Sequence, residues 1–152
     1  MLKNKRVLVT GSDGQLGKTL QKRCLNNQGF DWIFLPKEEL DIIETKEIQE
    51  AFKKYKPKFC INCAAFTDVL KSEKQPSLAF KINVEGVKNL TQICNDNETI
   101  LIHISTDYIF DGTKKRPYVE NDKANPLNAY GMTKYLGEKH VLENANFGYI
   151  IR

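Results

Sequence analysis

The sequence predicts an α/β fold, in which a doubly wound parallel sheet is covered by helices on both faces. Short apolar segments alternate with amphipathic helical patterns along the whole chain. The apolar segments are nearly continuous hydrophobic runs, which is typical of parallel strands buried on both faces. The first of these segments leads directly into a glycine-rich turn at residues 11–17. Together these observations predict one domain that covers residues 1–152.

Each element has its own signal. The predicted strands are short and apolar, and they cover residues 6–10, 31–35, 58–63, 100–104 and 148–151, with a short extended piece at Leu40–Ile43. The predicted helices have apolar residues three or four apart, and they cover residues 15–28, 45–55, 76 to about 95, and a segment that follows Pro126 and runs to about Asn144. Thr45 is expected as an N-cap, and Pro57 blocks continuation of that helix. A polar loop is expected at 111–125.

Composition and charge exclude several classes of protein. The formal net charge is +4, and the densest basic stretch, Lys53 to Lys58, is better explained as a solvated helix end than as a nucleic-acid patch. No nucleic-acid-binding motif accompanies it. No apolar run approaches the ~20 residues that cross a membrane. The first strand begins almost at residue 1, so no signal peptide is expected, and a cytoplasmic location is predicted.

The four cysteines are expected to be reduced. Cys60 and Cys63 lie within an apolar predicted strand, where thiols commonly serve as small core residues. A zinc site would need a second pair of ligands, and His103 and His140 are not arranged to supply one. No metal site is therefore predicted.

The glycine-rich turn predicts a dinucleotide site. Gly11, Gly14 and Gly17 follow a strand and open a helix. Glycines at such a turn let the backbone approach a diphosphate, and the helix N-terminus faces the anion. The spacing is Gly-x-x-Gly-x-x-Gly rather than Gly-x-Gly-x-x-Gly, and an ordinary glycine-rich turn is the alternative. Its position between strand and helix favours a Rossmann-like cofactor site.

Tyr130 and Lys134 form the candidate proton-transfer pair. Residues four apart lie on the same face of a helix, and a nearby ammonium is expected to lower the pKa of a phenol. Alone this spacing arises by chance on many solvated helices. Ser105 and Thr106 directly follow a predicted strand, where their hydroxyls would face a ligand, although such residues also favour turns and caps. A hydroxyl, a phenol and an ammonium beside a nicotinamide would suit carbonyl reduction.

On these motifs the chain resembles the extended short-chain dehydrogenase/reductase superfamily, and within it the dTDP-4-dehydrorhamnose reductase family. The matching segments occur in the family's order and span nearly the whole chain: Val9–Gly17, Leu40–Ile42, Ile61–Thr67, Ser105–Gly112 and Pro126–Glu138.

The resemblance implies a role for each matching residue. The catalytic set would be Thr106, Tyr130 and Lys134, of which Tyr130 and Lys134 would also touch the cofactor. The implied cofactor-binding residues are Gly11, Gly14, Gln15, Leu16 and Gly17 at the pyrophosphate, Asp41 and Ile42 at the adenine, and Ala64, Ala65, Thr67 and Ser105 toward the nicotinamide. Asn83 would hold the loop behind the cofactor or simply cap local backbone. Glu138 would pair with Lys134 or be a surface partner.

The sequence departs from the family pattern at three places. Leu70 stands where an acidic residue is usual. The second strand ends in Pro36 and Lys37 rather than in an acidic residue that would bind the ribose 2′-hydroxyl. Lys37 could contact a 2′-phosphate instead or be a solvated lysine, and NADP is slightly favoured over NAD. Family members also continue for roughly as long again, so the C-terminal substrate lobe is expected to be absent from these residues.

The implied activity is NAD(P)H-dependent reduction of the C4 keto group of a nucleotide-linked 4-keto-6-deoxy sugar, as in dTDP-L-rhamnose biosynthesis. The fragment alone is expected to be inactive. The alternatives are a related sugar-nucleotide epimerase or dehydratase, and a non-catalytic NADP-binding module like the regulatory subunit of methionine adenosyltransferase. The expected partner is a nucleotide sugar, and neither nucleic acid nor membrane is expected. A homodimer is considered, although the sequence does not decide the oligomeric state.

Overall fold

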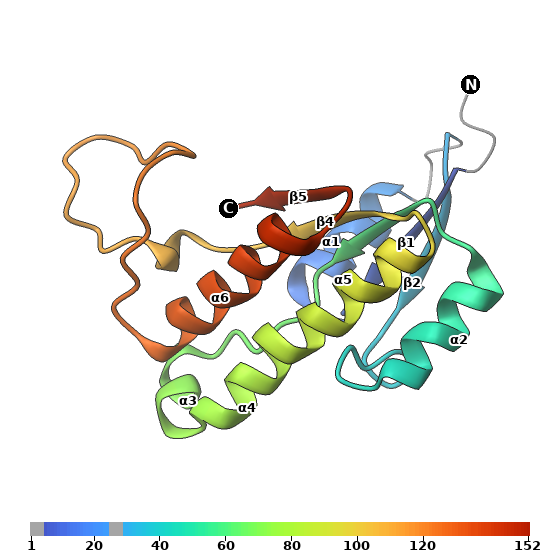
Figure 1. Ribbon diagram of the computed structural model, residues 1–152, viewed down its shortest axis with the longest axis horizontal. Helices are drawn as coiled ribbons and strands as arrows, with labels where there is room; N and C mark the ends of the chain where they lie inside the picture. The colour runs from blue at the N-terminus through green and yellow to red at the C-terminus, as the bar shows by residue number, and fades with distance from the viewer. Residues whose placement is uncertain (1–4, 25–28) are drawn as a thin grey trace.

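The computed structural model describes residues 5–24 and 29–152 and contains a sheet of five parallel strands in the order β2-β1-β3-β4-β5 (Figure 1). The strands are β1 (Arg6–Thr10), β2 (Asp31–Leu35), β3 (Phe59–Asn62), β4 (Ile100–Ile104) and β5 (Gly148–Ile151). Val7 of β1 lies opposite Trp32 on one side and Phe59 on the other. All five predicted strands are confirmed, and β3 is one residue shorter at each end than expected.

The helices connect these strands. They are α1 (Gln15–Cys24), α2 (Thr45–Tyr55), α3 (Val69–Lys74), α4 (Pro76–Phe80), the π-helical η1 (Lys81–Gly86), α5 (Val87–Asp96), the short 3₁₀ helix η2 (Asp107–Ile109) and α6 (Ala129–Asn144). Because α4, η1 and α5 follow without a break, the long helix predicted from Pro76 is confirmed, with an unexpected π-helical middle. The predicted end of the first helix, at Gln28, lies outside the described residues.

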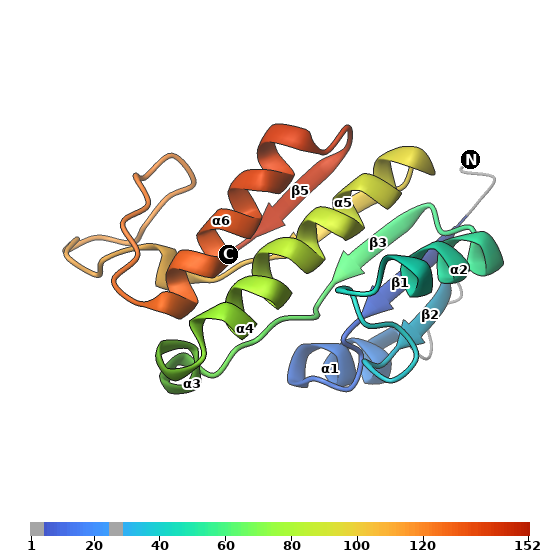
Figure 2. The same ribbon diagram turned by 60° about the horizontal axis from the view of Figure 1, so that its bottom comes forward.

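The helices cover both faces of the sheet. Figures 1 and 2 show α2, α5 and α6 over one face and α1 over the other. From β1 the chain steps sideways to β2, and every later crossover runs in the opposite direction across the sheet. Because such crossovers are right-handed, reversing the direction moves the connecting helix to the other face. The predicted doubly wound arrangement is therefore confirmed.

The core lies mainly between the sheet and the layer formed by α2 and α5. Leu8 and Leu101 from the sheet are fully buried there, as are Ile48 of α2 and Leu90 of α5. Burial of apolar surface is the main favourable contribution to folding, and these side chains fix how the helices sit on the strands. Within the described residues, no helix is both long enough and apolar enough to cross a bilayer.

Two local expectations are wrong. Leu40–Ile43 forms a turn rather than an extended piece, because the Asp41 carboxylate accepts the Ile43 N–H at 3.2 Å and Glu47 accepts the Asp41 N–H at 2.7 Å. Thr45 is the first helical residue of α2 and not its N-cap. Glu44 holds the cap position in an extended conformation, without a side-chain capping bond.

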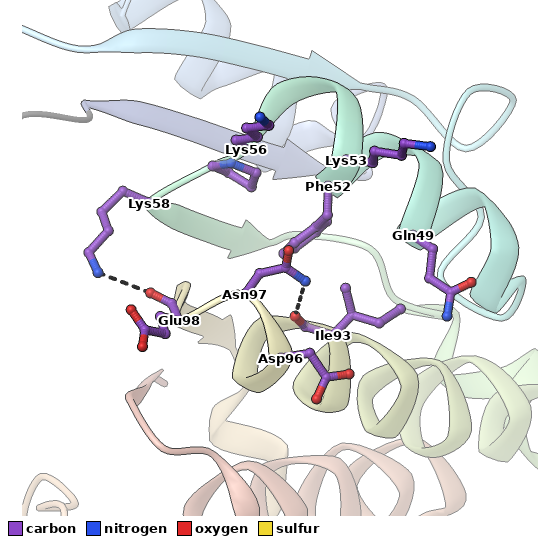
Figure 3. A pocket seen from close by; sticks show the side chains of 10 residues that line it. Gln49, Phe52, Lys53, Lys56, Lys58, Ile93, Asp96, Asn97 and Glu98 are labelled. Carbon is purple, nitrogen blue, oxygen red and sulfur yellow. Dashed lines mark hydrogen bonds between the residues drawn. The ribbon is translucent and has the colours of Figure 1, made fainter.

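The lysine-rich stretch lies at the amino edge of the sheet, where α2 ends, beside a hollow shared with the end of α5 (Figure 3). Lys58 donates to the Glu98 carbonyl at 3.0 Å, and the Asn97 side chain donates to the Ile93 carbonyl at 2.8 Å. The Ile93 carbonyl also accepts the Asn97 backbone N–H at 3.2 Å, so Asn97 caps the end of α5, and Lys58 joins the turn after α5 to the segment after α2. The interpretation of this stretch as a helix end is confirmed.

Candidate active site

A crevice opens at the carboxyl edge of the sheet between β1 and β3. The chain leaves these two neighbouring strands in opposite directions, so this is the switch point where doubly wound sheets bind ligands. Gly11 begins the loop after β1 with a φ of +60°. A Cβ at Gly11 would lie 2.7 Å from the Cα and N of Ala64, which follows β3. Only glycine therefore fits here, and the two loops meet backbone to backbone.

The groove above this contact brings together many of the predicted cofactor residues. It is lined by Gly11, Asp13, Gly14, Lys37, Leu40, Asp41, Ile42, Cys63, Ala64, Ala65 and Ile82. Sequence reasoning did not assign Asp13, Leu40, Cys63 or Ile82 to the site. Each of the four lies within two residues of a predicted site residue, so closeness in the sequence is the signal that could have identified them. Lys37 stands exposed at the rim, and its ammonium lies 3.6 Å from the Asp41 carboxylate.

Other predicted cofactor residues lie outside that lining. Gly17 packs beneath the loop, where an added Cβ would lie 2.5 Å from the Cα of Ser12. Its role in the structure is close packing of α1 against the loop. Gln15 and Leu16 are exposed on the first turn of α1, and Thr67 is exposed beyond β3.

A chain of buried polar groups that sequence reasoning missed lies below the groove. The Thr10 hydroxyl donates to the side-chain oxygen of Asn62 at 2.7 Å. The side-chain nitrogen of Asn62 lies 3.1 Å from the Nδ1 of His103. The same Asn62 oxygen accepts the Ala64 N–H at 3.2 Å. Burial, and then the nearby Lys134, hold the pKa of His103 well below its usual value. His103 is therefore a neutral ring whose Nδ1 accepts a hydrogen bond from the Asn62 side chain. This series of hydrogen bonds ties the ends of β1, β3 and β4 together.

Thr106 and Tyr130 reach the same edge from different elements. Thr106 follows β4 and caps η2 by accepting the Tyr108 N–H at 3.2 Å. Tyr130 lies in the first turn of α6, where the Asn128 side chain accepts the Gly131 N–H at 2.7 Å and so fixes the start of the helix. The Tyr130 side chain is buried, and its ring contacts the edge of Tyr108 with 5.5 Å between centroids.

Burial raises the pKa of Tyr130, and a hydrogen bond with the Thr106 side chain opposes that rise. The expectation that Lys134 lowers this pKa is therefore wrong in the structure described. The Lys134 ammonium is directed to the Ile104 carbonyl, to which it donates at 2.5 Å. Burial lowers the pKa of Lys134 to about 8, against the opposing effects of Glu138 and Cys63.

Asn83 and Glu138 have partners that the sequence did not identify. The Asn83 side chain accepts the Phe66 N–H at 2.8 Å and donates to the Phe66 carbonyl at 3.0 Å, so it holds the loop after β3. Glu138 is only 1% exposed and pairs with Arg152, at 2.6 Å between Oε1 and Nη2. The surface interpretation of Glu138 is wrong because β5 brings Arg152 onto α6.

The cysteines are free thiols, and Cys60 and Cys94 are buried in the core as predicted. Cys63 is half-buried beside the groove, and burial raises its pKa to about 11. The thiol is therefore protonated at neutral pH, when it is a poor nucleophile and metal ligand.

A parallel sheet of this order, with a glycine loop at its switch point and a buried Tyr–Lys pair at the same edge, defines a Rossmann-like domain of the short-chain dehydrogenase/reductase type. The family model described as "RmlD substrate binding domain" matches residues 5–152. The chain belongs to this family.

Individual relatives agree with the family. The dTDP-4-dehydrorhamnose reductase of Streptomyces griseus is 39% identical over 148 residues, which cover 97% of this chain and 48% of the relative. Bovine methionine adenosyltransferase 2 subunit beta is 37% identical over 147 residues, which cover 93% of this chain and 44% of the relative. The structure of dTDP-4-dehydrorhamnose reductase from Bacillus anthracis str. Ames in complex with NADP is 38% identical, with a TM-score of 0.93 over 98% of this chain and 53% of that one. The chain spans about half the length of these relatives.

Proposed function

We propose that this chain is the cofactor-binding part of an NAD(P)H-dependent reductase that acts on the C4 keto group of a nucleotide-linked 4-keto-6-deoxy sugar. The observation that supports this most is that Thr106 acts on the Tyr130 phenol, while Lys134, one turn further along α6, lies near Cys63, which lines the groove at the switch point. The reductases of Streptomyces griseus and Bacillus anthracis, similar over nearly all of the chain, support the substrate class.

The groove fits a dinucleotide. Its floor, where Gly11 meets Ala64, is backbone, and a Cβ at Gly11 would overlap the Ala64 main chain. Backbone at a glycine loop is suited to a diphosphate, and the N-terminus of α1 follows directly. Asp41 and Ile42 would hold the adenine end, and Ala64 and Ala65 would lie toward the nicotinamide. The bound cofactor would supply the hydride.

The chain's own residues would supply the proton and would orient the ketone of the substrate. The Tyr130 phenol is protonated at neutral pH, since burial raises a pKa that is ordinarily near 10, and it can donate its proton to the ketone oxygen as the alcohol forms. Thr106, whose side chain acts on the phenol, would orient that oxygen. Lys134 is cationic below pH 8, and its ammonium would hold the nicotinamide ribose of the bound cofactor. Asn83 would keep the loop at Phe66 in place beside the cofactor.

The sugar nucleotide would be held mainly by residues beyond the part that this chain matches. The relatives are about twice as long as the region of similarity. We propose that residues 1–152 form the cofactor domain and that a further lobe, as long again, binds the substrate. The free thiols of the chain fit a reducing compartment, and we propose a cytoplasmic location.

Tyr130→Phe in the complete protein tests the reaction. The variant keeps the ring but loses the acidic proton, so kcat should fall by about a hundredfold or more while NADPH affinity is unchanged. Tyr149→Phe, at a residue that is 63% exposed, is the matched control and should keep full activity. Reduction of a dTDP-linked 4-keto sugar is followed by loss of NADPH absorbance. Full activity of Tyr130→Phe would exclude this role for Tyr130.

Lys37→Ala tests the cofactor preference. An ammonium at the groove rim would contact a 2′-phosphate, so the variant should bind NADPH about five- to tenfold more weakly and NADH within about twofold of wild type. Fluorescence titration with both nucleotides measures this, and Lys53→Ala at the opposite edge is the control. An equal loss for both nucleotides would contradict a 2′-phosphate contact.

A non-catalytic regulatory module is the second candidate, because the bovine methionine adenosyltransferase 2 subunit beta is nearly as similar as the reductases. The two functions differ in whether the protein reduces a 4-keto sugar or only binds the cofactor. Cofactor binding by the complete protein without reduction of a 4-keto sugar would favour the regulatory module. Net consumption of NADPH would favour the reductase, and it would also argue against an epimerase, which regenerates its cofactor in each cycle.

A further inference from the structure

Glu138 is a buried carboxylate that the proposed reaction does not use. It lies on α6 one turn beyond Lys134, and only 1% of it is exposed. Arg152, directly after β5, donates to both of its oxygens, from Nη2 to Oε1 at 2.6 Å and from Nε to Oε2 at 3.2 Å. A buried carboxylate is costly unless it is paired, and a two-pronged arginine pair fixes both distance and orientation. The pair therefore locks α6 to the end of β5.

The same guanidinium also holds the loop between β4 and α6. Its Nη1 donates to the Glu120 carbonyl at 2.9 Å, and its central carbon lies 5.5 Å from the ring centroid of Phe110. The Phe110 ring stacks on Tyr118 at 4.2 Å. The loop projects beyond the carboxyl edge of the sheet in both views (Figures 1 and 2). Arg152 thus joins three parts of the molecule: α6, β5 and the loop at 110–125.

This loop links the proposed catalytic groups. Thr106 stands just before it and Tyr130 just after it. The Asn125 N–H donates to the Ile109 carbonyl at 2.8 Å, which closes the base of the loop. A shift of the loop against α6 would therefore change the position of Thr106 relative to the Tyr130 phenol.

We propose that Glu138 and Arg152 are positioning residues, which hold the 110–125 loop against α6 so that Thr106 and Tyr130 face the same ketone oxygen. This inference rests on the proposed reductase function. Neither residue lines the groove beside Gly11. Apart from the direct effect of the Glu138 charge on Lys134, both would act through the loop and the helix. The competing explanation is that the pair only stabilises the fold.

Two conservative variants of the complete protein, Glu138→Gln and Arg152→Lys, separate these explanations. Glutamine keeps the shape without the charge, and lysine keeps the charge without the fork of parallel donors. Positioning predicts that kcat falls by about ten- to a hundredfold in both variants, while the Kd of NADPH stays within about twofold. Glu143→Gln is the matched control, because Glu143 forms an exposed pair with Lys139 on the same helix.

Hydrogen–deuterium exchange of residues 110–125 provides a readout that does not need turnover. Faster exchange in the two variants but not in Glu143→Gln, together with the loss of kcat, is the expected result. Unchanged kcat in the folded variants would overturn the inference, as would a loss of kcat that only accompanies a loss of NADPH binding and of Tm. If the wild-type protein reduces no keto sugar, the proposed function fails instead. Hydrogen–deuterium exchange then remains the only test of whether the pair holds the loop. Unchanged exchange of residues 110–125 in both variants would overturn the inference.

Discussion

Lys134 shows how burial can change the chemistry of a residue that the sequence places correctly. Its ammonium is almost fully enclosed, and its contact is a backbone carbonyl, that of Ile104. A carbonyl offers only a partial charge, so desolvation prevails and the pKa falls to about 8. Near neutral pH a modest change in the surroundings could thus change the charge of this side chain.

This predicts how stability depends on pH. The folded pKa of Lys134 is about 8 and the unfolded value is 10.5. Between these values the unfolded chain binds more protons than the folded one, so the free energy of unfolding should rise as pH increases from about 8 to 10.5, by up to about 3 kcal/mol. Lys134→Met should lack that rise. Urea unfolding at several pH values, with Lys139→Met as the exposed control, measures the difference. Parallel curves for wild type and Lys134→Met would contradict the lowered pKa.

At the scale of elements, α6 and η1 cross at unusually short range. A Cβ at Gly137 of α6 would lie 2.2 Å from the backbone oxygen of Asn83 in η1. Gly137 has an ordinary helical φ, which does not itself require glycine. Glycine is required because the Asn83 backbone leaves no room for a Cβ. The crossing brings Asn83 close enough to donate to Thr133 at 3.1 Å, so it couples the helix of the proposed catalytic pair to the loop at Phe66.

Gly137→Ala should therefore force the two helices apart. The expected destabilisation is about 1–3 kcal/mol, although alanine ordinarily favours a helix. Thermal or urea unfolding measures it, and Glu143→Ala on the exposed side of the same helix should change stability little. NADPH affinity should fall as well, because Asn83 moves with the crossing. Equal or greater stability of Gly137→Ala would show that the helices can separate without cost.

Most elements could be predicted from the sequence because their signals are local. The strand at Arg6–Thr10 has a continuous apolar centre, Val7–Val9, and Pro76 marks where a helix can begin. The short α3 was missed, although Asp68 caps it by accepting the Lys71 N–H at 2.9 Å. The π-helical turn at Lys81–Gly86 has no comparable local signal.

At the scale of the whole molecule, the site could be predicted only where its residues belong to a motif. Gly11 and Tyr130 stand in recognisable patterns, and the fold brings both to the same edge. Thr10, Asn62 and His103 form one buried chain, but they come from three strands, and no spacing in the sequence relates them. The partner of Glu138 was missed for the same reason, since Arg152 meets it only after β5 has formed.

The contact between Gly11 and Ala64 has a consequence for engineering. The bottom of the groove is main chain on both sides, so its width is set by the spacing of β1 and β3 and not by any side chain. If the proposed cofactor site is correct, redesign of nucleotide preference should therefore concentrate on the rim, at Lys37 and Asp41, which lie outside the five strands.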